Sequence, residues 1–155
     1  MMRRCLSLIL VFLLSTVSYA KSSISISSLD YEIAGVAIAK EGNYLVEVSA
    51  MVDKKKDATI EIAKQCAIHG CLFKGFVVDR IFQKPIMSLP SIEKEHQVFF
   101  KKLIREQYQN YTNSIYPIQI VKVGKRYRVK AIILVAKDAL RKTMEKEGII
   151  SKLGL

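Results

Sequence analysis

The residues that decide the fold are Tyr44 to Val52, "YLVEVSAMV", where apolar and polar side chains alternate. The apolar side chains that share one face of an extended chain are Tyr44, Val46, Val48, Ala50 and Val52. Glu47 and Ser49 fall on the opposite face. A period of two is typical of a β-strand that packs one face against a core. We therefore predict a half-buried strand over residues 44–52.

The residues around this strand predict a hairpin that leads into a helix. Residues 31–39, "YEIAGVAIA", have the composition of a partner strand, and "EGN" at 41–43 is typical of a turn. Residues 53–57 break the alternation. Beyond them, Ala58, Ile62 and Cys66 recur at four-residue spacing, which predicts a short helix with one apolar face, ending near His69.

A second hairpin and helix are predicted near the carboxyl end. Residues 116–123, "YPIQIVKV", and 126–136, "RYRVKAIILVA", are two strand-like runs separated by Gly124-Lys125. Asp138 is expected to open the last helix and Gly148 to close it.

Between the two hairpins the sequence predicts one strand and one long helix. The apolar run "CLFKGFVV" at 71–78 is typical of a strand with Gly75 at a bulge or close approach. Ser91 is a good N-cap, so we expect a helix over 91–111. His96 falls on the apolar face of that helix, which predicts a packed histidine at the edge of the core rather than a base.

The two hairpins share a pattern at a constant offset of 83 residues. Tyr44, Val46 and Val52 recur as Tyr127, Val129 and Val135, each time in the second strand of a hairpin that precedes a helix. We infer two hairpin–helix units, with the sheet antiparallel or mixed and its helices on one face. The predicted fold class is therefore α+β, in the form of a two-layer sandwich.

The first twenty residues, "MMRRCLSLILVFLLSTVSYA", have the pattern of a secretory signal peptide. Two arginines precede a mostly apolar run from Cys5 to Val17, and small residues at Ser18 and Ala20 suit cleavage after Ala20. The run is shorter than the roughly 20 residues that cross a bilayer, so we expect no stable membrane span after cleavage. The protein is accordingly predicted to be exported, to the periplasm or outside the cell.

Removing the first 20 of 155 residues leaves a chain of one-domain size, with a flexible leader at 21–30, a single α+β domain at 31–150 and a tail at 151–155. Loss of Arg3 and Arg4 reduces the 25 basic residues to 23 against 14 acidic ones, a net charge of +9. An exported protein does not ordinarily meet nucleic acid. An envelope protein or an anionic envelope component is the partner that this charge favours.

The run "YRVKAIILVAKDALRKTMEKEGII" at 127–150 resembles the closing strand and helix of small α+β modules in bacterial envelope lipoproteins and flagellar-assembly proteins. Cys5 lies at the start of the apolar run and not after it, so the chain departs from the lipoproteins in lacking a lipidation cysteine after its signal. The resemblance implies an accessory or assembly role without catalysis.

The stretch "CAIHGC" at 66–71 holds two of the three cysteines and one of the two histidines. Three soft ligands at irregular spacing in a single cluster do not make a zinc signature, so no metal is predicted. The spacing instead fits a helix end in which Gly70 is left-handed and Cys66 contacts Cys71. In an oxidising compartment these cysteines would be either a packed thiol pair or a structural disulfide.

No catalytic constellation or cofactor-binding motif is found, so the sequence favours function by binding. Five cations around the second hairpin turn are the candidate binding residues: Lys122, Lys125, Arg126, Arg128 and Lys130. Lys54, Lys55 and Lys56, at the first hairpin–helix junction, are expected to extend the same cationic edge. Two hypotheses result: an exported cell-envelope binding or assembly accessory protein, and, as the alternative, a small secreted enzyme without a recognisable motif.

Overall fold

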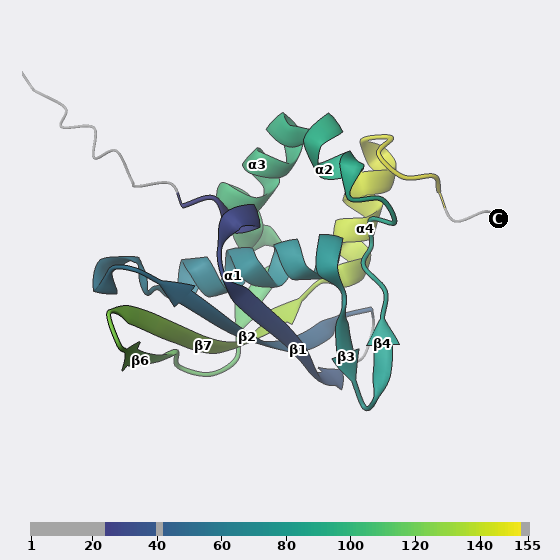
Figure 1. Cartoon of the computed structure of the whole chain (residues 1–155). Coiled ribbons are helices and arrows are strands. Elements are labelled where there is room, and N and C mark those ends of the chain that lie inside the picture. The colour runs from purple at the N-terminus through teal and green to yellow at the C-terminus, as the bar shows by residue number, and fades with distance from the viewer. Residues whose placement is uncertain (1–23, 40–41, 153–155) are drawn as a thin grey trace, which may run out of the picture.

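The computed structural model describes residues 24–39 and 42–152, and it confirms the predicted α+β fold class. A five-stranded antiparallel sheet has the order β1-β2-β7-β5, with β6 also paired to β7, and β3 and β4 form a separate two-stranded sheet (Figure 1). The strands are β1 (Tyr31–Ile38), β2 (Tyr44–Val52), β3 (Phe76–Val78), β4 (Ile81–Gln83), β5 (Thr112–Ser114), β6 (Gln119–Val123) and β7 (Arg126–Val135). The α-helices are α1 (Ile60–His69), α2 (Ser91–Glu95), α3 (Gln97–Arg105) and α4 (Lys137–Lys146).

The two predicted hairpins are both present, and their second strands pair with each other at the centre of the sheet. β2 and β7 run antiparallel, with Tyr44 opposite Val135 and Val52 opposite Tyr127. Val48 lies directly opposite Ala131, its counterpart at the offset of 83. When two copies of one strand pair antiparallel about a twofold axis, the central residue of each copy lies opposite its own counterpart, as Val48 and Ala131 do here. The offset observed in the sequence therefore corresponds to a local twofold arrangement of the central strands.

One face of the sheet forms the core. Every second residue of β2 is buried, as is every second residue of β7 from Val129 onward, and α1 packs against both strands on this face. All four α-helices lie on the same side of the five-stranded sheet (Figure 1). α1 lies against the sheet and α3 packs against α1, so the helical side is deeper than one layer of helices.

The α-helix ends at His69 as predicted, but the predicted left-handed cap at Gly70 is wrong. Gly70 has φ −63° and ψ −45°, which is helical, and the chain continues as a π-helical segment, η3 (Gly70–Lys74). Gly75, at φ +71°, is the left-handed residue that ends it. An added Cβ at Gly70 would lie 2.8 Å from Cδ1 of Ile33, so a small residue is needed there for packing against β1 and not for a turn.

The long helix predicted at 91–111 is interrupted. His96, at φ −112°, separates α2 from α3, and residues after Arg105 form only a short 3-10 helix, η4 (Tyr108–Asn110). His96 is exposed, so its predicted place at the core edge is also wrong. Ser91 is the first helical residue, and no side chain caps this end. Buried Phe100, Leu103 and Ile104 are the residues of α3 that reach the core.

Ordered structure begins before Tyr31, where the sequence predicted a flexible leader. Residues Ile26–Ser28 form a 3-10 helix, η1, and the Ile26 side chain is buried in the core. A second 3-10 helix, η2 (Lys55–Asp57), follows β2. Gly148, at φ +70°, follows α4 as predicted. The signal-like residues 1–20 lie outside the described residues.

Candidate functional site

The five predicted cations lie on the β6–β7 hairpin, but acidic residues from elsewhere in the chain contact two of them. Arg126 contacts Asp30 at 3.2 Å and Asp53 at 3.1 Å, and it also donates to the Met51 carbonyl at 3.2 Å. Lys130 lies 3.2 Å from Glu47 on β2. The structure thus assigns Arg126 and Lys130 to ion pairs across the sheet.

The other three cations are exposed and occupy different places. Lys122, Lys125 and Arg128 make none of the ion pairs found within residues 24–39 and 42–152. Arg128 faces away from the core, because its neighbour Val129 is fully buried. Lys122 lies on β6 and Lys125 in the turn, so these two flank the free edge of the sheet.

β6 is the outermost strand beside β7 and is exposed along its whole length. All five residues Gln119–Val123 are exposed, including Ile120, Val121 and Val123. Its only strand partner among the described residues is β7. An edge strand of this kind presents backbone N–H and C=O groups that another chain can pair with.

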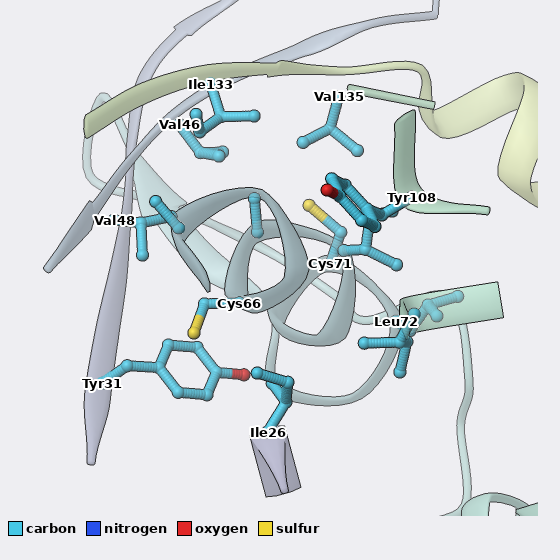
Figure 2. Close-up of a cluster of buried hydrophobic side chains, with 14 of the residues drawn as sticks. Ile26, Tyr31, Val46, Val48, Cys66, Cys71, Leu72, Tyr108, Ile133 and Val135 are labelled. Atoms are coloured by element: carbon cyan, nitrogen blue, oxygen red, sulfur yellow. The ribbon is translucent and has the colours of Figure 1, made fainter. Parts of the chain in front are cut away.

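Cys66 and Cys71 are both free and buried in the core. Figure 2 shows the Cys66 sulfur directed toward Tyr31 and the Cys71 sulfur toward Tyr108, so the two thiols point into different parts of the core. The predicted contact between the two cysteines depended on a turn at Gly70, and the continuing helix removes it. Burial raises the pKa of each thiol to about 12, which keeps both protonated at neutral pH.

The third residue of that stretch, His69, belongs to a buried polar chain that the sequence did not predict. The Tyr31 hydroxyl lies 2.6 Å from Nδ1 of His69, and Nε2 of His69 lies 3.1 Å from Oε1 of Glu93. The Lys74 ammonium sits 3.6 Å from the centroid of the Tyr31 ring and donates to the Tyr31 carbonyl. β1, α1 and α2 are thereby linked through three side chains.

The protonation of this chain follows from burial. Burial raises the pKa of the Tyr31 phenol, so the phenol stays protonated and donates to Nδ1 of His69. Burial also lowers the pKa of His69, although Glu93 acts in the opposite direction. A neutral His69 then donates from Nε2 to the Glu93 carboxylate, and each ring nitrogen has a partner.

His69 and Glu93 border a pocket of about 600 Å³ between η1 and the α2–α3 segment. Ile26, Phe100 and Ile104 give it an apolar floor, while Lys94 and Lys101 lie on its rim. No group of three or more His, Cys, Asp or Glu side chains is arranged to hold a metal ion in the part of the chain that the structure describes. Over the same residues, no helix is both long and apolar enough to cross a membrane.

Tyr31, His69 and Glu93 are 38 and 24 residues apart in sequence, so no local spacing indicated that they would meet. Comparison of the chain with protein-family models, with curated proteins and with solved structures gave no match.

Proposed function

We propose that the protein is an exported cell-envelope accessory protein that binds another envelope protein at the free edge of β6. Export is inferred from the signal-like residues 1–20 and binding from the β6 strand. The observation that carries the proposal is that β6 has three exposed apolar side chains and no strand on its outer side among the described residues.

The edge suits a partner segment that adds as a further strand. In strand addition, main-chain hydrogen bonds supply affinity and the side chains on alternate positions supply specificity. Val123 and Arg126 flank a two-residue turn, so in an antiparallel ladder they bond to each other. By the same alternation, the N–H groups of Ile120 and Lys122 are directed to the outer edge.

The charges at this edge favour an extended partner segment that carries apolar and acidic residues. Lys122 and Lys125 are exposed, and no carboxylate within the described residues pairs with them. An exposed ion pair with the partner is screened at physiological salt over about 8 Å, so binding should weaken as salt is raised.

The alternative, a small secreted enzyme, has the pocket beside Glu93 in its favour. Histidine is the side chain whose ordinary pKa lies nearest neutral pH, and His69 is the histidine that lines this pocket. However, Tyr31 occupies one ring nitrogen and Glu93 the other, which leaves no nitrogen to accept a substrate proton. The geometry therefore favours a structural role for His69 and a binding function for the protein.

The test compares two substitutions of one residue. Ile120→Ala removes the exposed side chain and keeps the outward N–H, while Ile120→Pro also removes the N–H, a change that an edge strand tolerates. We expect the proline variant to lose capture of its partner from envelope extracts and the alanine variant to retain most of it. Equal capture by both variants would exclude strand addition at β6.

A second comparison tests the charges. Lys122→Ser with Lys125→Ser should weaken capture and reduce its dependence on salt. The matched control, Lys142→Ser with Lys146→Ser, removes two exposed cations from α4 and should change neither. If both pairs of substitutions weaken capture equally, only the net charge matters and the edge has no special role.

A further inference from the structure

The outer face of the five-stranded sheet, opposite the helices, is not covered by any element among residues 24–39 and 42–152. All four α-helices lie on the other side (Figure 1). On the outer face, the residues of β2 and β7 that alternate with the core-facing residues are half-buried or exposed. An antiparallel sheet can leave one face in water, but such a face is normally polar.

One half of this face is apolar. Leu45 of β2 lies directly opposite Leu134 of β7 on one side and Ala37 of β1 on the other, and Val36, at the β-bulge next to Ala37, is 45% exposed. Next to them, Ile132 and the 59% exposed Tyr116 line a groove of about 410 Å³. A contiguous apolar area on a sheet face indicates an interaction surface.

The other half of the face is charged but nearly balanced. Its acids are Asp30, Glu32, Glu47 and Asp53, and its bases are Arg126, Arg128 and Lys130. Three ion pairs already join members of the two sets, at 3.1 to 3.2 Å. The whole chain, in contrast, has a formal net charge of +11.

This balance decides which partner the face fits. An acidic partner would gain little, because carboxylates of the chain itself already neutralise most of the cations. Two copies of so basic a protein repel each other over most of their surfaces. At the outer sheet face that repulsion is absent, and opposite charges on the two copies can meet.

We propose that two copies of this chain associate through their outer sheet faces, as a twofold symmetric dimer with the apolar halves in contact. In such an isologous contact each copy presents the same patch to the other. Two sheets packed face to face lie about 10 Å apart, with their side chains interleaved. The β6 edges stay free at the sides of the dimer, so this contact is independent of the proposed partner site.

The test measures the molar mass of the purified protein in solution, by light scattering or sedimentation, over a wide range of protein concentration. We expect a dimer for the wild type. Leu45→Lys and Leu134→Lys each place a charge in the centre of the apolar half and should each give a monomer. Their far-ultraviolet circular dichroism should remain that of the wild type, because both side chains face away from the core.

The matched control is Val98→Lys on α3, where the original side chain is 85% exposed on the helical side of the molecule. This variant should remain a dimer. A wild type that is monomeric at every concentration would overturn the proposal, as would a dimer that both leucine substitutions leave intact. Neither result would bear on binding of an envelope partner at β6, because that binding is measured separately, by capture from envelope extracts.

Discussion

The Tyr31 hydroxyl donates to Nδ1 of His69 across 2.6 Å in the core, joining the first strand of the sheet to the last residue of α1. Tyr31→Phe leaves the buried imidazole nitrogen without a partner. Such a loss costs about 1–3 kcal/mol in the free energy of unfolding. Denaturant unfolding of the variant should show a lower midpoint.

The control for this variant is Tyr111→Phe. The Tyr111 hydroxyl contacts Oγ1 of Thr143 at 3.0 Å at a part-buried position, where a water molecule can take the place of the removed hydroxyl. The expected cost is about 1 kcal/mol or less. If Tyr31→Phe is no more costly than Tyr111→Phe, the Tyr31–His69 bond does not stabilise the fold as inferred.

Stability should fall as pH decreases below about 6.5. Burial lowers the pKa of His69 in the folded state, so the unfolded chain binds a proton first as the pH falls. The unfolded state then holds more protons, and the free energy of unfolding decreases with decreasing pH until the folded His69 also titrates. Above the unfolded pKa the contribution is fully present. The measurement is the denaturation midpoint between about pH 7.5 and pH 5.5, above the range where most carboxylates titrate.

His69→Gln should flatten this dependence, while His96→Gln, which replaces the exposed histidine between α2 and α3, should retain it. A wild-type midpoint that is constant over this range, or a slope that His96→Gln removes, would contradict the assignment to His69.

The sheet could be predicted from sequence because its pattern is local. Alternation in residues 44–52 identified the core face of β2, and the offset of 83 agrees with the register that places Val48 opposite Ala131. The role of Gly70 could not be predicted, because a glycine there fits both a left-handed cap and close packing on Ile33. Only the fold distinguishes these two roles.

The same distinction between local patterns, which the sequence shows, and long-range contacts, which it does not, applies to the candidate site. The run of cations at 122–130 is visible in sequence, and the outward direction of Arg128 follows from the period of two. That Arg126 meets Asp30 and Asp53 is a contact between residues 96 and 73 positions apart, which no spacing indicates. The chain from Tyr31 to Glu93 was missed for the same reason.

Both cysteines should remain reduced thiols that react only when the protein unfolds. Cys66 and Cys71 are buried and free, and their pKa values are raised to about 12 by burial. The thiolate is the reactive form, so a thiol reagent should not label the native protein. In denaturant without reductant, two thiols of the processed chain should react.

A Ser91→Cys variant supplies the control, since Ser91 is exposed and its replacement should react at once in the native protein. If denatured wild type reacts only after a reductant is added, the two cysteines form a disulfide and the packed-thiol interpretation is wrong.

The exported protein should begin at Lys21. Arg3 and Arg4, the apolar run and the small residues before the expected cut motivate this prediction. Intact-mass analysis and amino-terminal sequencing of exported protein are the measurements. An Ala20→Arg variant should accumulate uncut, whereas Lys21→Ser should be processed normally; retention of Met1 in the exported wild type would rule out cleavage.

Gly75 and not Gly70 should be the glycine that the chain cannot replace at the end of the first helix. Gly75 has φ +71°, and a Cβ there would lie 2.5 Å from the Gln83 carbonyl oxygen. Gly75→Ala should therefore lower the free energy of unfolding by roughly 3 kcal/mol, from left-handed strain and a backbone clash together.

Gly124→Ala is the matched control, because Gly124 has φ +60° but no atom within 4 Å of an added Cβ, so about 1 kcal/mol of strain is expected. Gly70→Ala keeps a helical backbone and meets the flexible end of Ile33, so it should cost less than Gly75→Ala. If Gly70→Ala is instead the most damaging of the three in denaturant unfolding, close packing on Ile33 and not the backbone conformation at Gly75 makes the larger demand for glycine.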